Sequence, residues 1–156
     1  MAALLTLLWL LLCALQDLQQ RRIANRLTLP ALGFALLWLL WYGSTFAGTG
    51  GNNGLTAALI ALALTLPGFL LGKMGAGDIK MMLAFALLTG PMAVLWAVAL
   101  AALGLLGWQA AAVAVWPHLP AAMQRYAWTL APSRHQQRPY APFVFIAAVI
   151  YFLAGY

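Results

Sequence analysis

Apolar segments recur along almost the whole of this 156-residue chain and leave only short connections between them. They cover residues 2–16, 27–42, 55–72, 78–89, 92–116 and 141–156. Only 6% of the residues are charged, whereas soluble domains carry about 25%. A chain of this kind has no segment that could form a separate soluble domain. The sequence therefore predicts an all-α polytopic membrane protein with about six transmembrane helices, forming one domain over residues 1–156.

The connections between these segments differ in composition. Residues 43–54 contain five glycines and no charge, which is typical of a flexible polar loop. Residues 117–140 contain four prolines and form the longest connection. Within it, Met123, Ala127 and Leu130 have helical spacing, which is consistent with a short helix in the membrane interface or with an ordinary loop rich in aromatic residues.

All the lysine and arginine side chains fall in alternate connections. They are Arg21, Arg22, Arg26, Lys73, Lys80, Arg125, Arg134 and Arg138. Because cytoplasmic loops are enriched in these residues, this face is predicted to be cytoplasmic and both termini to be non-cytoplasmic. The net charge of +6 is explained by this topology, and we expect no nucleic-acid partner, since no nucleic-acid motif accompanies the charges.

The chain contains two acidic residues, Asp17 and Asp78, and no glutamate. Each lies where an apolar segment meets a basic connection, on the same predicted face. Two carboxyl groups that share a proton can activate a water molecule, as in aspartic proteases. The alternative is that each aspartate pairs with a neighbouring arginine or lysine at the interface. That alternative is less consistent with a chain that keeps only two acids, both on one side.

The surroundings of the two acids suggest different roles. Gly75 and Gly77 precede Asp78 and would let a substrate strand approach closely. If a helix starts near Asp78, its dipole favours the ionised carboxylate, whereas Asp17 ends the first helix, where the dipole opposes ionisation. We expect Asp78 to activate water and Asp17 to hold the shared proton.

Other polar residues have simpler interpretations. Asn25 is predicted to cap the second helix, and Lys80 to extend toward the lipid headgroups. Cys13 is predicted to be a small apolar filler. His118 and His135 have no acidic or cysteine partners, so the sequence predicts no metal site and no cofactor.

Three stretches resemble the type IV prepilin peptidases. GKMGAGDIKMMLAFALLTG (residues 72–90) resembles their second catalytic motif, G-x-G-D-x-K, and DLQQRRIANRLTLP (residues 17–30) resembles the first, although the family usually has proline in place of Ala24. PYAPFVFIAAVIYFLAG (residues 139–155) resembles the closing helix. The resemblance covers the whole chain in order.

The resemblance implies a membrane aspartic endopeptidase of the bacterial inner membrane. Such an enzyme removes the basic leader peptide from type IV prepilins or pseudopilins at the cytoplasmic face of the bilayer. The catalytic residues would be Asp17 and Asp78, with support from the motif residues Gly75, Gly77, Lys80 and Asn25.

Longer members of this family carry a cytoplasmic domain with paired cysteines and also N-methylate their product. This chain resembles the compact form of tight-adherence pilus systems, so we expect peptidase activity without N-methyltransferase activity. The alternatives are another G-x-G-D intramembrane protease, of the preflagellin type, or a non-enzymatic membrane subunit with an ion or proton site.

Overall fold

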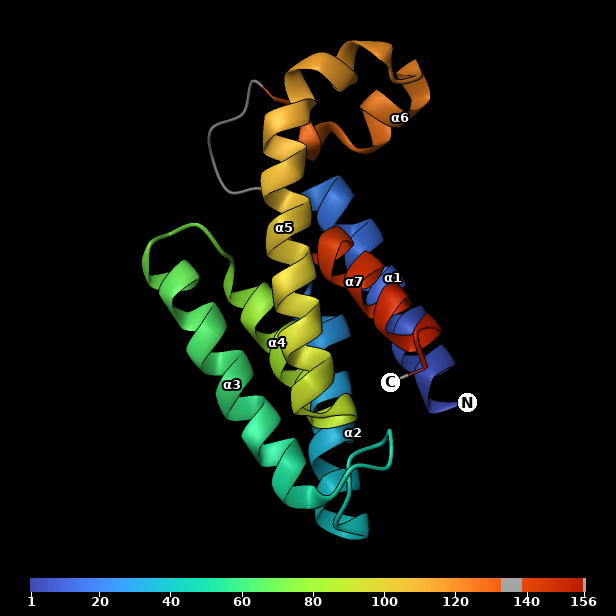
Figure 1. The fold of residues 1–156 in the computed structure, drawn as a ribbon, viewed down its shortest axis with the longest axis vertical. Coiled ribbons are helices and arrows are strands. Elements are labelled where there is room, and N and C mark those ends of the chain that lie inside the picture. Colours follow the sequence, from blue (N-terminus) through green and yellow to red (C-terminus); the bar gives the residue numbers. More distant parts are fainter. Residues whose placement is uncertain (133–138, 156) are drawn as a thin grey trace.

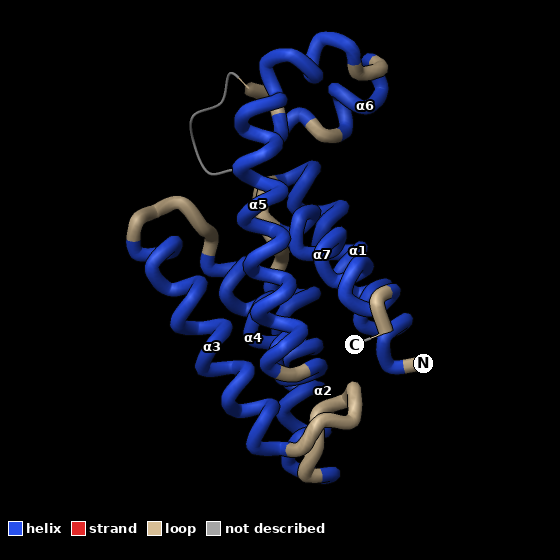
Figure 2. The backbone as a smooth tube through the Cα atoms, viewed as in Figure 1, coloured by secondary structure: helices blue, strands red, loops and turns tan. Residues whose placement is uncertain are grey.

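The computed structural model describes residues 1–132 and 139–155, which are almost entirely helical (Figures 1 and 2). The elements are α1 (Ala2–Gln20), α2 (Asn25–Tyr42), α3 (Gly51–Leu70), α4 (Ala76–Thr89), α5 (Pro91–Val115), η1 (Trp116–His118), α6 (Ala121–Tyr126), η2 (Trp128–Leu130) and α7 (Ala141–Leu153). These described residues form no β-strand beyond one isolated bridge between Ser44 and Gly50. The prediction of an all-α fold is confirmed.

Each of the six predicted apolar segments forms a helix. By length and composition, α1, α3 and the continuous α5–η1 segment can each cross a bilayer. The helices α2, α4 and α7 lie where the sequence predicts them but are shorter or less apolar. One difference that bears on the site is in α1, which has 19 residues and a length of about 28 Å and continues to Gln20 instead of ending at residue 16. Asp17 consequently lies inside α1 and not at its end.

The helix α4 is the centre of the bundle. It packs against α2, α3 and α5, while α1 and α5 both pack against α7 (Figure 1). Met81, Met82 and Phe85 of α4 have no exposed surface. Because α4 is covered on all sides, it can be apolar around its whole circumference.

Small residues let the surrounding helices approach one another. Ala57 and Ala61 of α3, Ala97 of α5 and Ala148 of α7 are completely buried. In lipid, helix association depends on close packing and less on the hydrophobic effect, so alanines at the contacts are effective.

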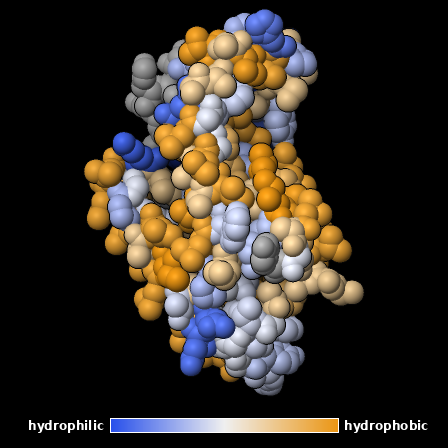
Figure 3. Space-filling view, viewed as in Figure 1, coloured by the Kyte–Doolittle hydropathy of each residue, from blue (hydrophilic) through white to orange (hydrophobic). Residues whose placement is uncertain are grey.

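Large apolar side chains cover the outer surface. Leu37 and Leu40 of α2 and Leu59 of α3 are each more than two-thirds exposed, at 69%, 81% and 68%. Figure 3 shows hydrophobic residues over most of the middle of the molecule. An apolar surface of this extent indicates contact with lipid, and the protein is a membrane protein.

The loop between α2 and α3 is a hydrogen-bonded cap, which differs from the flexible loop expected from its glycines. Thr45 is 1% exposed, and its hydroxyl lies 2.8 Å from that of Thr49. Both hydroxyls donate to the Thr89 carbonyl, at 3.2 and 3.0 Å. The Ala47 N–H donates to the Leu88 carbonyl at 2.8 Å. The loop thus satisfies carbonyl groups at the C-terminal end of α4, which would otherwise have no helical partner.

Residues 116–130 form a small helical cap at the opposite end of the molecule (Figure 1). The predicted interfacial helix is present only as the short α6, and Ala127 separates it from η2. Both chain termini lie toward the end that carries the α2–α3 loop (Figure 1). Ser133, Arg134, His135 and Arg138 lie outside the described residues.

Candidate active site

Asp78 lies in the first turn of α4 and is held by a local hydrogen bond. Gly75 is the N-cap of this helix, and its N–H donates to Asp78 Oδ2 at 2.9 Å. The side chain is 8% exposed. Its other oxygen, Oδ1, is buried and has no hydrogen-bond partner among the described residues. Buried acceptors rarely lack a hydrogen-bond partner, so Oδ1 is a candidate for a catalytic atom.

The two glycines before Asp78 have different roles. A Cβ atom on Gly77 would lie 2.9 Å from the Ile23 carbonyl oxygen and 3.2 Å from the Ile23 Cβ. A Cβ on Gly75 would make only ordinary contact, 3.4 Å from Asp78 Oδ2. The space that the sequence assigns to a substrate strand at Gly77 is therefore occupied by the α1–α2 connection.

Asp17 is held by a distant part of the chain. It is 4% exposed, and its Oδ2 accepts a hydrogen bond from the N–H of Ala141, the first residue of α7, at 3.0 Å. The carboxyl group also interacts with the backbone of Tyr140. The predicted end of the first helix at Asp17 differs by one turn from the structure, because α1 continues to Gln20. The first N–H of α7 also faces Asp17, so the positive end of a second helix acts on this carboxyl group.

The fold brings the two carboxyl groups together at one end of the bundle. They lie within electrostatic range of each other, and the thiol of Cys13 lies within range of both. Cys13 is completely buried in the apolar core. The hydrogen bond from Gly75 to Asp78 and the hydrogen bond from Ala141 to Asp17 are both donated by backbone N–H groups and not by basic side chains.

The cap of residues 116–130 is bound to the C-terminal end of α1, directly after Asp17. Thr129 Oγ1 donates to the Leu18 carbonyl at 2.9 Å, and Trp128 Nε1 donates to the Gln19 carbonyl at 3.0 Å. Arg21 lies over the Trp128 ring, 5.3 Å from its centroid, and donates to the Thr129 carbonyl at 3.2 Å. The last carbonyl groups of α1 are therefore capped by residues more than a hundred positions later. No pattern in the sequence predicts this arrangement.

Asn25 and Lys80 contact each other. Lys80 Nζ donates to Asn25 Oδ1 at 2.9 Å. The prediction that Asn25 caps α2 is wrong, because Ala24 is the N-cap and Asn25 is already helical, with its side chain turned toward α4. The pair links the start of α2 to the first turns of α4, next to the Gly77–Ile23 contact.

Tyr140 is a further residue of the site that the sequence analysis did not single out. It is 8% exposed, and its phenol lies within electrostatic range of Asp78. Its position in the P-Y-x-P stretch at the start of α7 was the available signal. Within residues 1–132 and 139–155, no group of three or more histidine, cysteine or acidic side chains is arranged to hold a metal ion.

A helical membrane bundle with two buried carboxyl groups at one end has the chemical groups of an intramembrane aspartic protease. The sequence model of the type IV leader peptidase family matches residues 4–155, and the chain belongs to this family. No match was found among the curated proteins or among the solved structures.

Proposed function

We propose that this protein is an aspartic endopeptidase that removes the leader peptide from type IV prepilins or pseudopilins, with Asp17 and Asp78 as its catalytic pair. One observation carries the proposal. The only two acidic residues of the chain come from separate helices, are both buried, and interact electrostatically. A membrane family of peptidases provides the context for that pair.

The reaction uses one carboxylate and one carboxylic acid. The carboxylate removes a proton from a water molecule, which attacks the carbonyl carbon of the scissile peptide bond. The acid donates its proton to the carbonyl oxygen, and a tetrahedral intermediate forms. The intermediate collapses when a proton is transferred to the leaving nitrogen, which breaks the C–N bond.

We assign the base to Asp78. Its Oδ1 has no hydrogen-bond partner among the described residues and can accept a proton from water. Asp17 Oδ2 is occupied by the Ala141 N–H, so the shared proton is assigned to Asp17 Oδ1. The unpartnered Oδ1 of Asp78 supports this division, whereas the helix-dipole argument no longer does, because the positive end of α7 faces Asp17.

The distribution of the basic residues supports a proposed orientation in the membrane. Arg21, Lys73 and Arg125 lie in connections at the end that holds the carboxyl pair. The excess of positive charge supports a cytoplasmic position for this end in the bacterial inner membrane, with both termini on the other side. A single cysteine and the short α1–α2 connection support peptidase activity without N-methyltransferase activity.

Cleavage of a co-expressed prepilin tests the proposal. We expect Asp17→Asn and Asp78→Asn each to reduce processing by at least about a hundredfold, because each removes a group that transfers a proton. Thr56→Val is the matched control, since its exposed hydroxyl bonds only to Asn52 in its own helix. Processing by either asparagine variant at the wild-type rate would contradict the proposal, as would failure of the wild type on prepilins from matched systems.

A further inference from the structure

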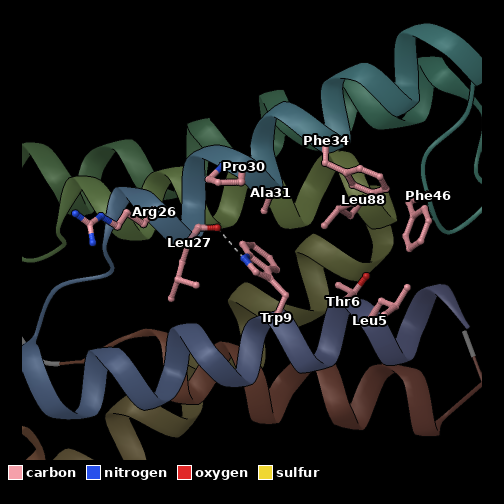
Figure 4. A pocket seen from close by; sticks show the side chains of 10 residues that line it. All are labelled: Leu5, Thr6, Trp9, Arg26, Leu27, Pro30, Ala31, Phe34, Phe46 and Leu88. Carbon is pink, nitrogen blue, oxygen red and sulfur yellow. Dashed lines mark hydrogen bonds between the residues drawn. The ribbon is translucent and has the colours of Figure 1, made fainter.

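The helices α1 and α2 are consecutive in the chain but pack mainly against other helices. Most contacts of α1 are with α7, and most contacts of α2 are with α4. Between α1 and α2 lies a groove with a volume of about 330 Å³ (Figure 4). Ten residues line it, and Arg26 is the only charged one among them.

The two ends of the groove differ. Arg26 lies at one end, and Phe34, Phe46 and Leu88 lie at the other (Figure 4). The Phe46 ring packs edge-on against Phe34, with a centroid distance of 5.3 Å. Trp9 extends from α1 across the gap and donates from Nε1 to the Leu27 carbonyl at 3.0 Å (Figure 4). The groove therefore has a charged end and an aromatic end.

The length of the groove matches one leaflet of a bilayer. Arg26 and Phe34 are eight positions apart on α2, which corresponds to about 12 Å along the helix. Half of the hydrocarbon core is about 15 Å thick. A transmembrane helix would need the full thickness, and a 12 Å length of helix occupies on the order of 900 Å³. A single acyl chain fits this groove better than a helix of a partner protein.

The charged end suits a phosphate group. A guanidinium group can bind phosphate through two parallel hydrogen bonds. Arg26 is the second residue of α2, and the N-cap residue Ala24 has no side chain that could accept hydrogen bonds from the first turn. Lys80, bonded to Asn25, brings a second positive charge to the same helix end. Backbone N–H groups at a helix start add to the attraction for an anion.

We propose that this groove binds one phospholipid of the surrounding bilayer. The acyl chain lies along Trp9 and Ala31 and ends at Phe34, and the phosphate binds Arg26. Anionic headgroups are preferred over zwitterionic ones because the headgroup then keeps a net negative charge beside two cations. Neither Asp17 nor Asp78 lines this groove, and the proposal does not depend on the peptidase reaction.

Native mass spectrometry of the purified protein with phosphatidylglycerol tests the charged end. We expect Arg26→Gln to reduce the lipid-bound fraction by about tenfold, in line with the loss of a charge-assisted hydrogen-bonded pair. The matched control is Arg22→Gln, which removes the same charge from an exposed residue nearby that does not line the groove. Equal loss in both variants would show non-specific attraction and overturn the proposal.

A second pair of variants tests the apolar part. Ala31→Phe fills the groove without changing any charge and is expected to lower lipid binding by about tenfold. Leu37→Phe, on the outward side of the same helix, is expected to leave it unchanged. Full retention of lipid by Ala31→Phe would overturn the proposal, and so would displacement of the lipid by inorganic phosphate alone, which would indicate a headgroup site without a chain.

Discussion

Asp17 and Asp78 are both buried, but the protein holds them in different ways. The Asp78 carboxyl accepts its hydrogen bond from Gly75, three residues earlier in the same helix start. The Asp17 carboxyl accepts its bond from Ala141, 124 residues later, at the start of α7. The first arrangement is formed entirely within a short segment of the chain, because donor and acceptor are three residues apart. The second exists only when the first and last helices are packed together.

The difference shows where the candidate site is sensitive. Changes near Asp78 act through a few backbone atoms in one turn. Changes near Asp17 act through the contacts of α7 and of the cap that holds Leu18 and Gln19. A long-range arrangement can be loosened from several places, whereas a local one fails only when its own turn is altered.

The strongest test of this contrast is Gly77→Ala, since Gly77 is the point where the local turn meets the α1–α2 connection. The new Cβ would lie 2.9 Å from a backbone oxygen of Ile23, so the connection must move. We expect a loss of about 1–3 kcal/mol in stability and about a hundredfold loss of prepilin cleavage, because small displacements of catalytic groups are costly.

Gly33→Ala is the control for that variant. Gly33 lies within α2 and has nothing within 4 Å of the position of the new Cβ, so the change is expected to be neutral or to stabilise by about 0.5–1 kcal/mol. Thermal unfolding in detergent and a cleavage assay provide both readouts. If Gly77→Ala behaved like Gly33→Ala, the Ile23 contact would have no role in the site.

Gly75→Pro tests the local hydrogen bond that holds Asp78. Proline lacks the N–H that bonds to Asp78 Oδ2, and the Gly75 φ of −83° is close to the range that proline adopts. We expect a fall in kcat of about tenfold, in line with the loss of one charge-assisted hydrogen bond. Gly75→Ala keeps the N–H and should change kcat less than about threefold. Equal activity of the two variants would show that this bond does not position Asp78.

Thr129→Val tests the long-range contacts near Asp17. It removes the hydroxyl that donates to the Leu18 carbonyl. A lost buried hydrogen bond costs about 1 kcal/mol, so we expect a small fall in stability and a several-fold fall in cleavage. Thr56→Val again serves as the comparison, because it removes the same group from an exposed position. An unchanged cleavage rate for Thr129→Val would mean that the cap does not support Asp17.

The smallest effect is expected for Lys80→Met and Asn25→Ala. Their hydrogen bond is exposed to solvent and should contribute about 0.5–1 kcal/mol. If loss of this hydrogen bond accounts for the lower cleavage rate, the double variant should cleave at the same rate as either single variant. Additive losses in the cleavage rate would instead assign separate roles to Lys80 and Asn25.

The sequence was sufficient to predict the helices, because apolar runs are local properties, and it singled out the two acids that the fold buries. It was not sufficient for the end of α1, which continues to Gln20 and where Thr129 and Trp128 satisfy the carbonyl groups of Leu18 and Gln19. The predicted capping role of Asn25 was also wrong, because its side chain accepts a hydrogen bond from Lys80, which lies in another helix.

The α2–α3 loop is another case in which contacts with a different element determine the structure. Its glycines predict flexibility, yet the hydroxyls of Thr45 and Thr49 bond to the end of α4. The partner atoms of all these residues lie on other elements, so no pattern within a short stretch of sequence could reveal them. By contrast, the turn that contains Gly75 and Asp78 follows the pattern of a helix start, and the sequence anticipated it.

The hydrogen bond from Ala141 to Asp17 has a consequence for the order in which the protein is made. Ala141 leaves the ribosome 124 residues after Asp17. While the chain is being inserted, both aspartates are present but α7 is absent, so the carboxyl of Asp17 lacks the backbone group that orients it. The candidate site is therefore assembled only after synthesis of α7, and a chain inserted only as far as α5 does not yet have the arrangement proposed for peptide cleavage.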